Sequence, residues 1–219
     1  MIVVPRPPSD IAARITAAAR ERFLRHGVDG ASLRSIAEDA GTSIGMVYYY
    51  FKTKDELFLA VFEDVYERLL ADMVRALDPT RAPEQRILAL YERIAAMDER
   101  EFAVVRLMLR EALISSDRLT RIAARFEQGH VPLVMRTLAD GVAAGRFDPH
   151  THPAALAVAS ISLALLPQIL HRLVTTAALP VAAALPGRDE AAHALFRVLL
   201  FGIAGPTLRA ESAPPEVER

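Results

Sequence analysis

Apolar residues recur three and four positions apart along most of the chain, and this spacing restricts the fold more than any other feature. Ile11, Ile15, Ala19 and Phe23, for example, fall on one face of a helix. No run of alternating β-branched residues bounded by turn residues occurs, so the sequence offers almost no strand signal. We therefore predict an all-α protein.

Helix-capping residues divide the first part of the chain into short helices. Ser32 can cap a helix over residues 32–40, and Ser43 can cap another over residues 43–51. Gly41 closes the earlier of the two, so that only a tight turn separates them. A helix, a short turn containing glycine and a second helix form the layout of a helix-turn-helix motif.

The later helices are expected to be longer. Thr53 and Glu56 have the spacing of a capping box, which predicts a helix from there to about Leu77. The remaining apolar stripes predict helices over residues 84–97, 101–115, 117–145, 153–170 and 189–203. Pro132 lies inside the third of these, so a kink or a break is expected there.

Composition bears on the apolar segment at residues 153–170. Hydrophobic residues make up 52% of the 219 residues and the mean hydropathy is +0.21, so a membrane-spanning helix is one reading of the segment. Pro167, Gln168 and the lack of tryptophan for an interfacial belt count against that reading. We expect a helix buried in an oligomer core. The chain has no cysteine and no signal peptide at its start, so we also expect a cytoplasmic protein.

The stretch GTSIG at residues 41–45 also satisfies the G-x-S-x-G pattern that surrounds the nucleophilic serine of many hydrolases. That pattern requires an apolar strand before the serine. Here Arg34, Glu38 and Asp39 are spaced as on the surface of a helix. We therefore interpret Ser43 as a helix cap and expect neither catalytic residues nor enzyme activity.

Charge and aromatic residues favour DNA as the partner of this motif. Residues 1–54 carry eight Arg and Lys against five Asp and Glu, a net charge of +3, although the whole chain has a net charge of −1. Tyr48, Tyr49 and Tyr50 are consecutive on a helix, so they cannot all face inward, and an exposed phenol can donate to a phosphate. Lys54 at the start of a helix opposes the helix dipole unless a phosphate lies beside it.

The stretch SLRSIAEDAGTSIGMVYYYFKTKDEL resembles the DNA-binding signature of the tetracycline-repressor (TetR) family of bacterial transcription regulators. The resemblance covers roughly residues 10–60, and it implies about nine helices in two domains. These are an N-terminal helix-turn-helix DNA-binding domain at residues 1–54 and a larger helical domain for effector binding and dimerisation at residues 55–209. We expect the polar tail at residues 210–219 to be disordered.

Carried over by position, the resemblance assigns DNA contacts to part of this stretch. The assigned residues are Ser32, Arg34, Thr42, Ser43, Ile44, Gly45, Met46, Tyr48, Tyr49 and Lys54. Ile44 and Met46 are apolar where many members carry polar residues, which suggests methyl contact or shape readout and leaves the operator sequence open.

The resemblance further implies a homodimer that binds a palindromic operator in double-stranded DNA, with no cofactor. The helices near residues 153–170 and 189–203 match the expected dimer interface. We expect a repressor that a small apolar or aromatic effector releases from its operator. Side chains that could line the effector pocket are Phe62, Tyr66, Tyr91, Met108, Phe126 and His130.

Two other classes of protein stay open at this point. The chain could be a helical enzyme or small-molecule carrier that uses the C-terminal pocket, although no pair of carboxylates at helical spacing supports this. The six histidines include no pair spaced i, i+4, so we expect no metal site. A membrane-associated helical protein is the other alternative, and it would partition into detergent.

Overall fold

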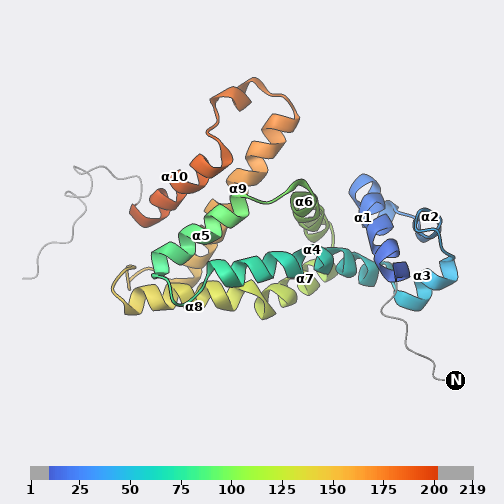
Figure 1. Cartoon of the computed structure of the whole chain (residues 1–219), viewed down its shortest axis with the longest axis horizontal. Coiled ribbons are helices and arrows are strands. Elements are labelled where there is room, and N and C mark those ends of the chain that lie inside the picture. Colours follow the sequence, from blue (N-terminus) through green and yellow to red (C-terminus); the bar gives the residue numbers. More distant parts are fainter. Residues whose placement is uncertain (1–9, 202–219) are drawn as a thin grey trace, which may run out of the picture. The chain divides into compact units, whose positions relative to one another are not determined.

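The computed structural model describes residues 10–201, and the regular structure of these residues consists of helices only (Figure 1). The α-helices are α1 (Asp10–Gly30), α2 (Leu33–Asp39), α3 (Ile44–Tyr50), α4 (Lys54–Ala76), α5 (Pro83–Ala95), α6 (Glu99–Ile114), α7 (Ser116–Gln128), α8 (His130–Ala143), α9 (Pro153–Thr176) and α10 (Arg188–Phe201). A short 3-10 helix, η1, spans Pro180–Ala184. The all-α prediction is confirmed, and the expected tail at residues 210–219 lies outside the described residues.

The chain divides into two compact units. Within the described part, unit 1 contains residues 10–75 and 97–132, and unit 2 contains residues 76–96 and 133–201. Unit 1 therefore adds α6 and α7 to the helix-turn-helix region, and α1 packs against α2, α3 and α6. The functional boundary expected after residue 54 remains a prediction, because compactness alone does not say which residues bind DNA.

The two short helices of the helix-turn-helix begin at the predicted serines. Ser32 Oγ accepts a hydrogen bond from Ser35 N at 3.5 Å, and Ser43 Oγ accepts one from Met46 N at 3.3 Å. Gly41 lies between them with a φ of 61°, in the left-handed region that favours glycine. The direction of α3 is therefore set by local chemistry in and beside the turn.

The capping box predicted at the start of α4 forms only in part. Thr53 Oγ1 accepts a hydrogen bond from Glu56 N at 3.1 Å, as expected. Glu56 Oε2, however, accepts from Lys52 N at 2.7 Å instead of from Thr53 N. The Glu56 side chain thereby holds the loop between α3 and α4.

The long helix expected over residues 117–145 is two helices that break at Gly129 instead of at Pro132. A proline ring clashes with the carbonyl four residues earlier in a continuous helix, which here is the carbonyl of Gln128. α7 accordingly ends at Gln128, and Pro132 lies in the first turn of α8. Gly129 suits the junction because a Cβ there would overlap the hydroxyl of Tyr66.

In unit 2, α5, α9 and α10 pack pairwise against one another, and α9 buries its more polar face. The buried residues Ser160, Ala164, Gln168 and Arg172 recur every four positions along α9. Its large apolar side chains point outward, and the most exposed are Val158, Leu166, Leu170 and Leu173. An amphipathic helix usually buries its apolar stripe in the core of its own chain. In α9 the apolar stripe instead stays uncovered in the single chain.

α9 continues to Thr176, beyond the predicted end at residue 170, with Pro167 inside it. Among the described residues it is the one helix whose length and composition would allow it to cross a membrane. Only 17% of its most apolar 18-residue window is buried within the chain. Burial in an oligomer core, as expected from the sequence, therefore requires a second molecule.

Candidate DNA-binding surface and ligand cavities

α3 has one buried side chain, Val47, and the remaining residues of the helix are exposed or half-exposed. Tyr49 is 69% exposed and Tyr48 is 50% exposed, so two of the three consecutive tyrosines project from the helix. Tyr50 is half-buried, and its ring meets that of Tyr49 edge to face with 5.1 Å between the centroids. The face of α3 opposite Val47 is therefore accessible to a partner.

The leading end of α3 carries the other predicted base-contacting residues. Ser43 and Gly45 are exposed, whereas Thr42, Ile44 and Met46 are half-exposed. All five are thus at least partly accessible, and their contacts with DNA stay a prediction.

Arg34 on α2 is exposed, and its guanidinium has no ion-pair partner among residues 10–201. It is therefore able to donate to a phosphate or to a base edge.

Ser32 is also exposed, but its hydroxyl already caps α2. α2 is joined to α1 by Arg22, which donates to the two carboxylate oxygens of Asp39 at 2.5 and 2.8 Å. The hydrogen bond from Arg22 lowers the pKa of Asp39 below its ordinary value.

Lys54 is the first residue of α4, as predicted, but its ammonium is not simply solvated. Lys54 Nζ donates to the backbone oxygen of Asp29 at 3.0 Å. A cation at this end of a helix is unfavourable, and Asp55 and Glu56 in the same turn offset it. The phosphate contact predicted for Lys54 would have to share its ammonium with Asp29.

Four of the six residues predicted to line an effector pocket form an aromatic cluster in unit 1. Phe62 stacks on Tyr66 with 4.9 Å between ring centroids, and Phe126 and His130 pack edge to face at 4.7 Å. His130 N donates to the Tyr66 hydroxyl at 3.3 Å, so that hydroxyl can in turn donate to His130 Nδ1 at 2.9 Å. Burial lowers the pKa of His130 below its ordinary value, which favours the neutral ring that can accept this bond.

The ring contacts of this cluster do not include the other two predicted pocket residues, and the expectation that all six line one pocket stays a prediction. Met108 is on the buried face of α6. Tyr91 is in unit 2, where its ring packs against Phe196 at 5.9 Å. The Tyr91 hydroxyl is buried without a hydrogen-bond partner among the described residues, and burial raises its pKa well above the ordinary value.

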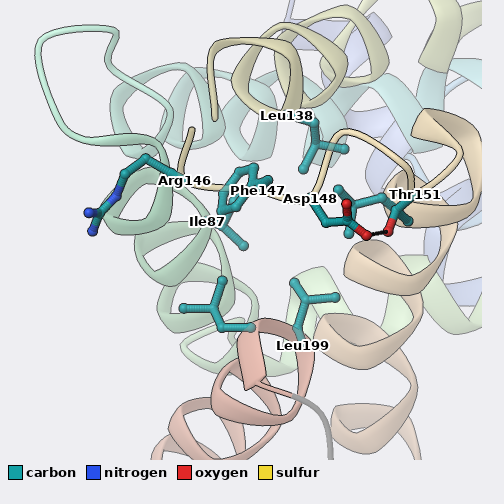
Figure 2. A pocket seen from close by; sticks show the side chains of 9 residues that line it. Ile87, Leu138, Arg146, Phe147, Asp148, Thr151 and Leu199 are labelled. Carbon is teal, nitrogen blue, oxygen red and sulfur yellow. Dashed lines mark hydrogen bonds between the residues drawn. The ribbon is translucent and has the colours of Figure 1, made fainter. Parts of the chain in front are cut away.

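A cavity of about 220 Å³ lies in unit 2 beneath the loop between α8 and α9 (Figure 2). Its apolar walls are Ile87, Leu138, Phe147, Leu156, Leu199 and Leu200, and its polar rim consists of Arg146, Asp148 and Thr151. Figure 2 shows the side chain of Arg146 pointing away from the cavity, and that side chain pairs with Glu84 at the start of α5. Asp148 accepts hydrogen bonds from His150 N at 2.9 Å and from Thr151 Oγ1 at 3.0 Å.

A second cavity, of about 440 Å³, shares Leu138, Thr151 and Leu156 with the first. Its other walls are Met135, Ala139, Val142, Ala143, Pro149 and Pro153. The two cavities are lined mainly by aliphatic side chains, so together they suit an apolar molecule. Neither cavity was predictable from the sequence, because the only signal was the proline-containing loop between two apolar helices.

No group of three or more His, Asp or Glu side chains within residues 10–201 is placed to hold a metal ion. The features present are an exposed helix of a capped helix-turn-helix, a nearby arginine without an ion-pair partner among the described residues, and apolar cavities in a separate helical unit. These features define an all-helical protein with an accessible helix-turn-helix, which is the layout of a DNA-binding domain.

Known proteins agree with this class. The family described as "Bacterial regulatory proteins, tetR family" matches residues 15–61. The HTH-type transcriptional regulator TtgW of Pseudomonas putida is 30% identical over 117 residues, which cover 52% of this chain and 87% of that protein. Rv1816 of Mycobacterium tuberculosis is 39% identical over 72 residues, covering 33% of this chain and only 31% of Rv1816.

Solved structures show the same fold over nearly the whole chain. FadR from Bacillus subtilis, in complex with stearoyl-CoA, superposes with a TM-score of 0.70 at 14% identity, covering 88% of this chain and 99% of FadR. The chain belongs to the TetR family of bacterial transcriptional regulators. Proteins of this family are regulators and not enzymes.

Proposed function

We propose that the protein is a homodimeric repressor that binds a palindromic operator through α2 and α3 and is released by an apolar effector. The proposal depends on the exposed tyrosines and the half-exposed first turn of α3. Their exposure does not stabilise the single chain, and it leaves them accessible to DNA. Arg34 on the adjacent helix adds an exposed cation that has no ion-pair partner among residues 10–201. Such a regulator works in the cytoplasm, where its DNA lies.

The outward apolar stripe of α9 supports the homodimer. Leu166, Leu170 and Leu173 are about half exposed or more, and Phe201 at the end of the described part of α10 is 61% exposed. An isologous contact between two copies would bury the same side chains on both protomers. Two α3 helices related by a twofold axis can then read the two halves of a palindrome.

The two cavities of unit 2 support an apolar effector. The larger cavity, of about 440 Å³, is of the size of small-molecule sites, the smaller one of about 220 Å³ shares three residues with it, and the walls of both are mainly aliphatic. The superposed FadR structure contains stearoyl-CoA. Long-chain acyl-CoA thioesters are therefore the first effectors to test.

DNA binding is tested with a palindrome that the wild-type protein selects from random duplexes, measured by fluorescence anisotropy at several salt concentrations. We expect salt-sensitive binding and a clear preference over a shuffled duplex of the same composition. Arg34→Ala should weaken binding, whereas Arg121→Ala, an equal charge change on the exposed surface of α7, should not. Equal binding to both duplexes would refute the proposed operator recognition.

The effector is tested by adding stearoyl-CoA to the protein–DNA complex, with free CoA as the control. We expect stearoyl-CoA alone to lower operator occupancy. Leu156→Trp should abolish this release and leave DNA binding intact, because Leu156 borders both cavities and the larger ring narrows them. Release that persists in this variant would show that the effector binds elsewhere.

A further inference from the structure

Five charged side chains gather in unit 1 around Arg118, a residue that no sequence pattern marks. The Arg118 cluster consists of Asp29, Lys54, Asp55, Arg110, Glu111 and Arg118. Three of these side chains are cationic and three are anionic, so the formal charges balance. They come from the end of α1, the start of α4, and from α6 and α7.

Arg118 uses all three guanidinium nitrogens on carboxylates. Its Nη2 and Nη1 donate to the two oxygens of Asp29 at 2.5 and 3.1 Å, and its Nε donates to Asp55 Oδ1 at 2.8 Å. Nη1 also donates to Glu111 Oε2 at 2.7 Å. The hydrogen bond from Arg118 lowers the pKa of Asp29, so this carboxylate stays charged. Only arginine has the planar fork that can hold these groups together.

Glu111 and Arg110 extend the cluster to the backbone at the end of α1. Glu111 Oε1 accepts from Val28 N at 3.2 Å, and Arg110 Nη2 donates to Phe23 O at 2.6 Å. Gly27, with a φ of 78°, bends the chain there. Side chains of α6 and α7 therefore hold both the end of α1 and the first turn of α4.

Burial distinguishes a fixed part of the cluster from a releasable part. Arg118 is 6% exposed and Glu111 is 1% exposed, whereas the side chains of Asp29 and Asp55 are 72% and 39% exposed. A buried ion pair adds little net stability, because desolvation offsets the attraction, and its best-attested role is to select one arrangement. The exposed carboxylates can leave Arg118 at small cost, since water solvates them readily.

We propose that Arg118 is a positioning residue for DNA recognition. The proposal rests on the proposed function as a dimeric DNA-binding regulator. Asp29 precedes α2 and Asp55 follows α3, so Arg118 holds both ends of the helix-turn-helix against α6 and α7. With α3 fixed in this way in each protomer, the two α3 helices of a dimer can bind their two half-sites at the same time. Release of either carboxylate removes this preorganisation and leaves the residues of α2 and α3 themselves unchanged.

Asp29→Asn and Asp55→Asn test the proposal, because each removes one carboxylate and leaves the buried pair of Arg118 and Glu111 in place. Asp117→Asn is the matched control, since Asp117 is exposed, precedes Arg118 and lies outside the cluster. All three substitutions remove one negative charge, so each raises the long-range attraction to DNA by a similar amount. A loss of affinity in the first two variants would therefore oppose the change in net charge.

Affinities are measured on the selected palindrome and on a duplex in which one half-site is scrambled. Relative to Asp117→Asn, we expect Asp29→Asn and Asp55→Asn to bind the palindrome about fivefold more weakly or worse, and the single half-site within about twofold. The slope of log affinity against log salt should not change, because no phosphate contact is lost. Arg118→Lys, which keeps the charge but not the fork, should show the same selective loss.

Equal losses on both duplexes would overturn the proposal, because they would place the damage within α2 and α3. Affinities equal to those of Asp117→Asn would overturn it as well. Wild-type protein without a preference for the palindrome would instead contradict the proposed function, so the two failures are distinguishable. Thermal unfolding of each variant identifies any loss that reflects an unfolded fraction.

Discussion

At the scale of single residues, Ser43 and Gly45 lie two positions apart at the start of α3, and the reasons for having serine at one position and glycine at the other differ. Ser43 is explained within the chain, because its Oγ accepts from Met46 N. Gly45 is not, because its φ is not positive and a Cβ there would meet only Ser43 Oγ at an ordinary 3.7 Å. Glycine inside a helix costs roughly 0.5–1 kcal/mol relative to alanine, so the folded chain gives no reason for glycine at position 45, and the proposed approach of DNA would give one.

Gly45→Ala should change stability and DNA affinity in opposite directions. We expect the free energy of unfolding to rise by about 0.5–1 kcal/mol, because alanine is the better helix former. Affinity for the selected palindrome should fall by roughly tenfold, because the methyl group lies where the DNA backbone would approach. Urea unfolding and anisotropy measure the two effects, and unchanged affinity would show that DNA does not come close to this position.

His130 should make the stability of unit 1 sensitive to acid. Its folded-state pKa lies below the ordinary value of 6.5 because the ring is buried, so the unfolded chain takes up the proton first. Stability is therefore complete above pH 6.5 and is lost as the pH falls below that value.

We expect the melting temperature of the wild type to fall more between pH 7.5 and pH 5.5 than that of His130→Gln. His193→Gln is the control, since His193 is half exposed beside Glu92. Parallel pH profiles for the wild type and His130→Gln would contradict this role of His130.

At the scale of elements, the junction of α7 and α8 depends on two residues that lie far apart in sequence. Gly129 provides the space that the hydroxyl of Tyr66 occupies, and that hydroxyl is held by His130. Phe62 stacks on the Tyr66 ring and Arg125 lies over it, 4.8 Å from the centroid, so the ring has little freedom to move. The helix break and the aromatic cluster are therefore one structural feature.

Gly129→Ala should destabilise the protein by about 1–3 kcal/mol, because the new methyl group displaces a ring that is packed on several sides. In a Tyr66→Phe background the loss should be smaller, since the overlapping oxygen is gone. A double-mutant cycle with urea unfolding measures the coupling. Additive effects of the two substitutions would show that the hydroxyl is not the source of the strain.

Local signals in the sequence were sufficient for the short helices of the helix-turn-helix, although they did not show the break at Gly129. Ser32, Gly41 and Ser43 act within three or four residues of their partners, so pattern alone located the helix-turn-helix. The Arg118 cluster was not predictable, because it joins Arg118 to Asp29 and Asp55, which lie more than 60 residues away in sequence. The outward apolar face of α9 was likewise hidden, because periodicity shows that a stripe exists and not which side is buried.

At the scale of the whole molecule, DNA recognition and effector binding are proposed to occupy different compact units, and dimerisation joins two copies of both. The candidate interface is the stripe of Leu166, Leu170 and Leu173 on α9. Its polar opposite face is already used within unit 2, where Gln168 Nε2 donates to the backbone oxygen of Arg188 at 3.3 Å. The stripe is therefore available to a second copy without any rearrangement of α9 within unit 2.

Leu170→Glu should convert the protein to a monomer, because each dimer would bury two carboxylates beside the twofold axis. Sedimentation velocity should show the smaller species, and affinity for the palindrome should fall by at least about tenfold. Leu113→Glu is the matched control, since Leu113 is 90% exposed on α6 and lies outside the stripe. A Leu170→Glu protein that stays dimeric would assign the interface to another surface.

The uncovered stripe of α9 also has a consequence for gene dosage. If assembly is what covers these leucines, the amount of functional regulator follows the square of the protomer concentration whenever protomers are scarce. Doubling expression would then raise the operator-binding species by up to about fourfold. Operator occupancy by such a regulator would therefore rise more steeply than the concentration of its protomers.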